Sequence, residues 1–88
     1  MEEPVASQIE KNKRRAEQTL MEILVGNEVN TRWEDPGHVG SYTLWFSVDG
    51  GKEEKIVFSH LVMMDGRSIN DPHYIENVIR QKIESLSL

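Results

Sequence analysis

The three histidines of this 88-residue chain are the side chains best suited to carry protons or to bind metal at neutral pH. His38 and His73 lie near Asp35 and Asp71, which supplies the ligand types of a His/Asp metal site. Their spacing matches no zinc motif such as HExxH, His60 stands within an expected strand, and the chain has no cysteine. We therefore predict that the protein uses no metal and no other cofactor.

The sequence also lacks the common catalytic arrangements. It has no GxSxG motif and no spacing that implies a Ser/His/Asp set. The paired carboxylates of Glu53 and Glu54 stand beside an expected hairpin turn, where water would solvate both and neither would be tuned for proton transfer. Gly50 and Gly51 lack the flanking residues of a phosphate-binding loop. We predict that the protein is not an enzyme.

A helix is expected near the N-terminus. Ser7 and Glu10 have the spacing of a capping box, and Gly26 marks the end of the helix. The apolar stripe of this helix is Ile9, Ala16, Leu20, Ile23 and Leu24. Because basic residues interrupt the stripe, we expect residues 8–15 to pack weakly and to project, and residues 1–7 to be flexible.

Three strands and a second helix follow. Alternating apolar and polar residues predict strands over 29–34, over 42–48, and from Lys55 to about Met64. Asp71 as N-cap and Pro72 in the first turn predict the start of the second helix. The apolar stripe of the second helix is Ile75, Val78, Ile79, Ile83 and Leu86.

The register of the hairpin between the second and third strands can be predicted. A three-residue turn, Asp49–Gly51, places Leu44 opposite Ile56 and Tyr42 opposite Phe58, which gathers apolar side chains on one face. The face expected to be buried carries Val29, Trp33, Tyr42, Leu44, Phe46, Val48, Ile56 and Phe58. The other face carries Asn30, Arg32, Thr43, Trp45, Ser47, Lys55, Val57 and Ser59.

We therefore predict an α+β fold: a two-layer α-β-β-β-α sandwich, with a three-stranded antiparallel meander and both helices on one face. The whole chain, residues 1–88, is expected to form a single domain. It is acidic, with 10 Lys and Arg against 15 Asp and Glu and a formal net charge of −5. No apolar run approaches the roughly 20 residues of a membrane span, so we expect a cytoplasmic protein without a membrane partner.

The polar face of the sheet is the main candidate for a contact surface. Trp45 is a large aromatic side chain on an otherwise polar face, and Arg32 is placed to stack on it. Trp and Arg are enriched among the residues that dominate protein interfaces. The set predicted to bind a partner is Trp45, Arg32, Lys55, Val57 and Thr43. The other explanation is that long neighbouring side chains simply cover the indole.

A resemblance to a nucleic-acid-binding family provides the alternative. The element order, with Pro36-Gly37-His38 ahead of a strand and Asp49-Gly50 after it, resembles the double-stranded RNA-binding domain over roughly residues 16–60. The resemblance implies phosphate contacts from basic side chains. The candidates for such contacts are Lys11, Arg14, Arg15 and His38. The second helix departs from the family because it opens with Asp71-Pro72 rather than with a basic cluster.

The sequence thus favours a small acidic, non-enzymatic protein-binding module, such as an adaptor, an inhibitor or a regulatory protein. Its size and acidity would suit a phage-encoded or accessory bacterial protein. The partner is expected to be another protein or a second copy, the latter through an edge strand or through Ile9 and Ala16 of two first helices. The alternatives are a nucleic-acid-binding domain and, third, a small-molecule binder.

Overall fold

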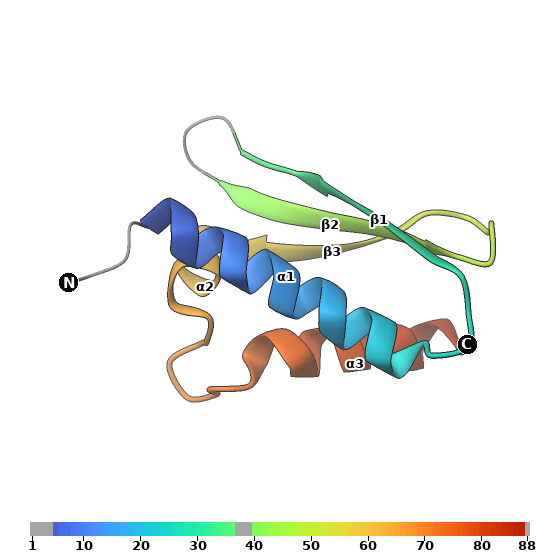
Figure 1. The fold of residues 1–88 in the computed structure, drawn as a ribbon. Coiled ribbons are helices and arrows are strands. Elements are labelled where there is room, and N and C mark those ends of the chain that lie inside the picture. Colours follow the sequence, from blue (N-terminus) through green and yellow to red (C-terminus); the bar gives the residue numbers. More distant parts are fainter. Residues whose placement is uncertain (1–4, 37–39, 88) are drawn as a thin grey trace.

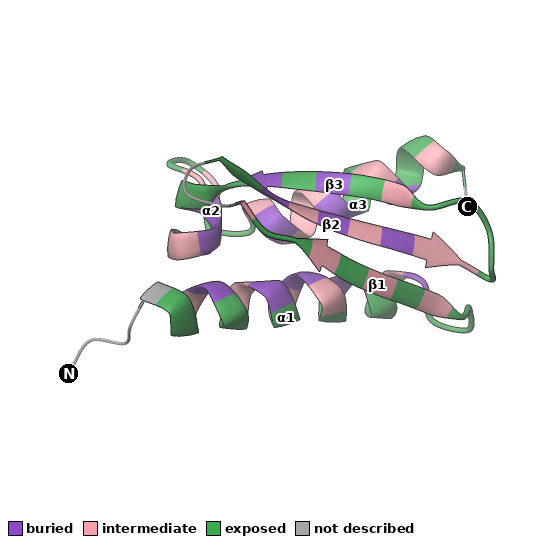
Figure 2. Ribbon diagram, turned by 90° about the horizontal axis from the view of Figure 1, so that it is seen from above, coloured by how far each residue is buried: buried purple, intermediate pink, exposed green. Residues whose placement is uncertain are grey.

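The computed structural model describes residues 5–36 and 40–87 and has the predicted α+β architecture (Figure 1). The elements are α1 (Val5–Ile23), β1 (Val29–Glu34), β2 (Ser41–Val48), β3 (Glu54–Ser59), α2 (His60–Asp65) and α3 (Tyr74–Leu86). The three strands form one layer, and the helices lie together beneath it. The other face of the sheet is covered by none of the described elements (Figures 1 and 2).

The sheet is an antiparallel meander in the order β1-β2-β3, which leaves β1 and β3 as edge strands. Tyr42 pairs with Phe58 and Leu44 with Ile56, so the predicted register is confirmed. A reversal after Val48 fixes this register. The amide of Gly51 donates to the carbonyl of Val48 over 3.0 Å, and the two residues between them have positive φ.

The core lies between the sheet and the helices (Figure 2). Five of the side chains predicted for the inner face are buried, and the other three are half-buried against the core. The buried five are Tyr42, Leu44, Phe46, Ile56 and Phe58; the half-buried three are Val29, Trp33 and Val48. The stripes of α1 and α3 complete the core, as predicted, with Ile23, Val78 and Leu86 at its margin.

Two predictions about α1 are wrong. The helix already includes Val5, so Ser7 lies inside it and does not cap it. Of residues 1–7, which are predicted to be flexible, 5–7 are helical and 1–4 lie outside the described residues. The first half packs rather than projects. Ile9 and Lys13 are buried, and the amide of Asn12 donates to the carbonyl of Met63 over 2.6 Å. Because Ile9 is buried in the core, it cannot also join two first helices.

The packing partner of this half is α2, although the sequence of this segment predicts the end of a strand. The third strand stops at Ser59, whose hydroxyl accepts from the amide of Val62 over 3.2 Å and caps α2. Gly66, in the left-handed conformation, ends the helix. A helix explains why residues 61–64 are apolar in succession: Val62 and Met63 turn inward, whereas Leu61 faces solvent.

The last helix begins two residues later than predicted, at Tyr74. Asp71 lies before the helix, but its carboxylate accepts hydrogen bonds from residues at the start of α3. One carboxylate oxygen accepts from the amide of His73 and the other from the side chain of Asn77, each over 2.9 Å. These hydrogen bonds lower the pKa of Asp71, the bond from Asn77 most.

The side chain of Arg15 links α1 to α3 and to the segment between α2 and α3. Arg15 of α1 donates through two nitrogens to the carboxylate of Glu76 in α3, with 2.7 Å between Nη2 and Oε1. It also donates to the carbonyl of Gly66 over 2.7 Å and to that of Pro72 over 3.2 Å. The hydrogen bonds from Arg15 hold the pKa of Glu76 below its ordinary value.

Gly66 is where we expect this arrangement to be most sensitive. An added Cβ would lie 2.8 Å from Oδ1 of Asn12 and 2.9 Å from Nη1 of Arg15, at a φ of +75°. We expect Gly66→Ala to lower the free energy of unfolding by about 2–4 kcal/mol in urea denaturation. Gly26→Ala is the matched control, because φ is +91° there but nothing lies within 4 Å. It should cost only about 1 kcal/mol, and equal losses would contradict the account.

Candidate functional site

The uncovered face of the sheet brings the predicted binding residues together (Figure 2). Arg32, Trp45 and Lys55 are direct neighbours across the three strands, and Thr43 and Val57 form the adjacent pair. We call these five residues the Trp45 face. Alternation along each strand puts them on the side opposite the core. Their role in binding remains a prediction.

The indole of Trp45 is held between two cations. The guanidinium carbon of Arg32 lies 4.8 Å from the ring centroid and Nζ of Lys55 lies 5.6 Å from it. The indole N–H donates to Glu34 over 3.0 Å. The ring is half-buried. Its contacts with Arg32, Lys55 and Glu34 hold its position. The long neighbouring side chains do cover part of the indole, as the simpler explanation supposed.

Arg32 is itself fixed by an ion pair. Its Nε and Nη2 donate to the two carboxylate oxygens of Glu53, each over 2.9 Å. The hydrogen bonds from Arg32 lower the pKa of Glu53, and the same pairing raises the pKa of Arg32. Two acidic side chains, Glu34 and Glu53, thus accompany the two basic ones around Trp45. The surface is charged, but its charges balance.

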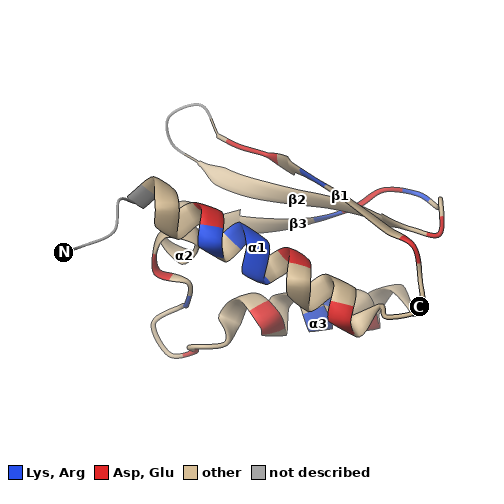
Figure 3. Ribbon diagram, in the orientation of Figure 1, with Lys and Arg blue, Asp and Glu red and all other residues tan. Residues whose placement is uncertain are grey.

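The basic run of α1 does not form one patch. Lys13 turns inward, where Nζ lies 2.8 Å from Asp35 and about 5.5 Å from the ring centroids of Trp33 and Tyr42. Arg15 is held by Glu76. Of the four residues predicted to contact phosphate, Lys11 and Arg14 are exposed, Arg15 is half-buried, and His38 lies outside the described residues. Figure 3 shows that acidic residues flank the basic run along α1.

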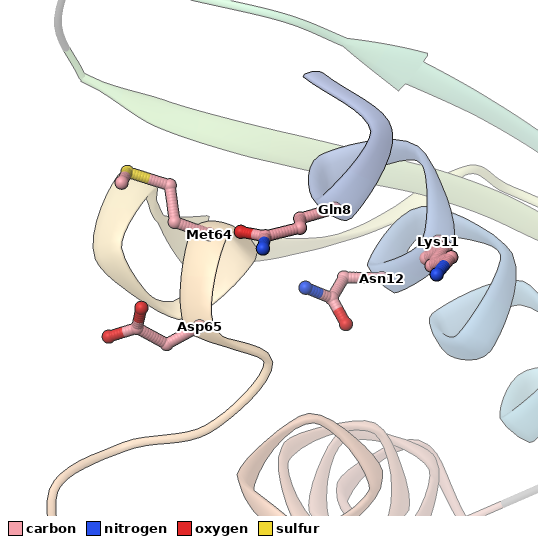
Figure 4. A pocket seen from close by; sticks show the side chains of 5 residues that line it. All are labelled: Gln8, Lys11, Asn12, Met64 and Asp65. Atoms are coloured by element: carbon pink, nitrogen blue, oxygen red, sulfur yellow. The ribbon is translucent and has the colours of Figure 1, made fainter. Parts of the chain in front are cut away.

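A hollow between α1 and α2 is lined mostly by polar side chains (Figure 4). It measures about 330 Å³ and is lined by Gln8, Lys11, Asn12, Met64 and Asp65. The amide of Asn12 already donates to Met63, so it is engaged in packing. Among residues 5–36 and 40–87, no group of three or more His, Cys, Asp or Glu side chains is arranged to hold a metal ion.

Sequence reasoning missed a more apolar hollow, of about 470 Å³, between α2 and the connection to α3. It is lined by Ser59, Leu61, Val62, Asp65, Arg67, Ser68, Ile69 and Asn70. The hollow was not predicted because the sequence pattern assigns residues 60–64 to a strand, whereas they lie in α2. The available signal was Ile69, an isoleucine in an otherwise polar turn segment.

Comparisons with protein-family models, with curated proteins and with solved structures found no match for this chain. Within the described residues, no helix is long and apolar enough to cross a membrane.

The contacts predict that Arg15 contributes to the stability of the fold and that Arg32 does not. Arg15→Gln should lower the free energy of unfolding by about 2 kcal/mol, because the partly buried carbonyl of Gly66 and the partly buried carboxylate of Glu76 lose their donor. Arg32→Gln should leave the urea midpoint unchanged within error, because its ion pair is exposed. Equal destabilisation by the two substitutions would show that the Trp45 face serves folding.

Proposed function

We propose that this protein is a small, non-enzymatic protein-binding module, and that the Trp45 face is its contact surface. The observation that carries the proposal is the fixed position of Trp45, between Arg32 and Lys55, on the central strand of a sheet with one uncovered face. A partner docking there would meet side chains that are already immobilised, which lowers the conformational entropy lost on binding.

The chemistry of the surface favours a protein over a nucleic acid. An indole and a guanidinium are typical anchors of protein interfaces, and Val57, 51% exposed, adds an apolar contact beside them. Phosphate binding instead needs an excess of positive charge. Glu34 and Glu53 supply negative charge next to Trp45 and Arg32, and the whole chain carries a net charge of −5.

The experiment is a pull-down from lysate of the source cells, with the tagged protein as bait, in the presence and absence of nuclease. A protein partner should remain after nuclease treatment and be lost with Trp45→Ala and with Lys55→Glu. Arg80→Glu is the matched control, because it makes the same charge change at an exposed position of α3. All baits are first checked for folding by circular dichroism.

Two outcomes would overturn the proposal. Loss of the captured material on nuclease treatment, with no effect of Trp45→Ala, would favour the nucleic-acid alternative. A captured protein that Arg80→Glu releases as readily as Lys55→Glu would place binding away from the Trp45 face.

A further inference from the structure

An exposed apolar surface lies at the end of the molecule where α2 leads into α3. Ile69 is 89% exposed and Leu61 is 68% exposed, and both line the 470 Å³ hollow beside α2. Neither side chain adds much to the core, because each is largely exposed. Exposed apolar surface around a hollow is typical of an interaction site.

The segment that carries Ile69 is braced. Ser68 and Asp71 exchange two backbone hydrogen bonds, of 3.1 and 3.3 Å. The guanidinium of Arg67 donates to the carbonyls of Ser68 and Ile69, each over 3.3 Å. Gly66 is anchored to α1 through Arg15. Ile69 is therefore presented on a fixed backbone, which reduces the entropic cost of inserting it into a partner.

The charges around the hollow are complementary to those of a second copy of this chain. Asp65 and Arg67, both exposed, are charged residues of opposite sign that line the same hollow as the two apolar side chains. A partner surface that is wholly basic or wholly acidic would place a like charge against Arg67 or against Asp65. A second copy related by a two-fold axis offers the opposite charge to each and an apolar hollow to each Ile69.

We infer that the protein forms a two-fold symmetric homodimer through this surface. Ile69 of each protomer enters the hollow of its partner, and Arg67 of each faces the partner's Asp65. The inference is independent of the Trp45 face, which lies on the sheet and would stay accessible to another protein.

Sedimentation equilibrium of the full chain over micromolar to millimolar concentrations tests the inference. The wild type should show a reversible monomer–dimer equilibrium, and Ile69→Asp should weaken dimerisation about 10-fold or more. Val25→Asp is the matched control, because Val25 is 80% exposed but lies just after α1, away from the hollow, and should leave the equilibrium unchanged.

A charge exchange then tests the pairing itself. Asp65→Arg alone and Arg67→Asp alone each place like charges across the dyad, so each should weaken dimerisation. Arg67→Asp also removes the hydrogen bonds to the carbonyls of Ser68 and Ile69, so Asp65→Arg is the cleaner single variant. Mixing the two variants should restore a dimer, because both contacts in the heterodimer are again between opposite charges. A wild type that is monomeric throughout, a dimer that Val25→Asp breaks and Ile69→Asp does not, or a mixture that stays monomeric would overturn the inference.

Discussion

Arg15 donates hydrogen bonds to three segments that are remote from it in the sequence: the end of α2, the connection at Pro72, and Glu76 in α3. Since α1 precedes the sheet and α3 follows it, Arg15 links the first and the last helix of the chain. Its own environment is only partly open to water, which limits the screening of the ion pair with Glu76. Arg15 also holds the carbonyl of Gly66, which begins the loop that carries Ile69.

The placement of the helices determines which side of the sheet must be polar. All three helices lie on one side, so the strands need polar side chains on the other side. The described chain fills that side with ion pairs and hydrogen bonds around Trp45. The two faces therefore differ: Phe46 and its neighbours are buried in the core, whereas the Trp45 face lies outside it. This division leaves one face of the sheet without a role in the core.

Period-two alternation and turn chemistry were enough to predict the sheet, its register and the fold class. The buried pairs Tyr42–Phe58 and Leu44–Ile56 leave only one register in which apolar residues share a face. The short helix α2 was missed because six residues are too few to show a helical period, although Ser59 and Gly66 marked its ends. The partners of Lys13 and Arg15 could not be predicted, since they lie 22 and 61 residues away and only tertiary packing brings them close.

The central claim is that the Trp45 face contacts another protein. The most direct measurement is site-specific photocrosslinking in the source cells, with a photoreactive amino acid in place of Val57, beside the indole on the uncovered face. The same residue in place of Arg80 on α3 serves as the control. The account predicts a discrete protein adduct from position 57 that is absent from position 80. No adduct at position 57, or the same adduct from both positions, would contradict it.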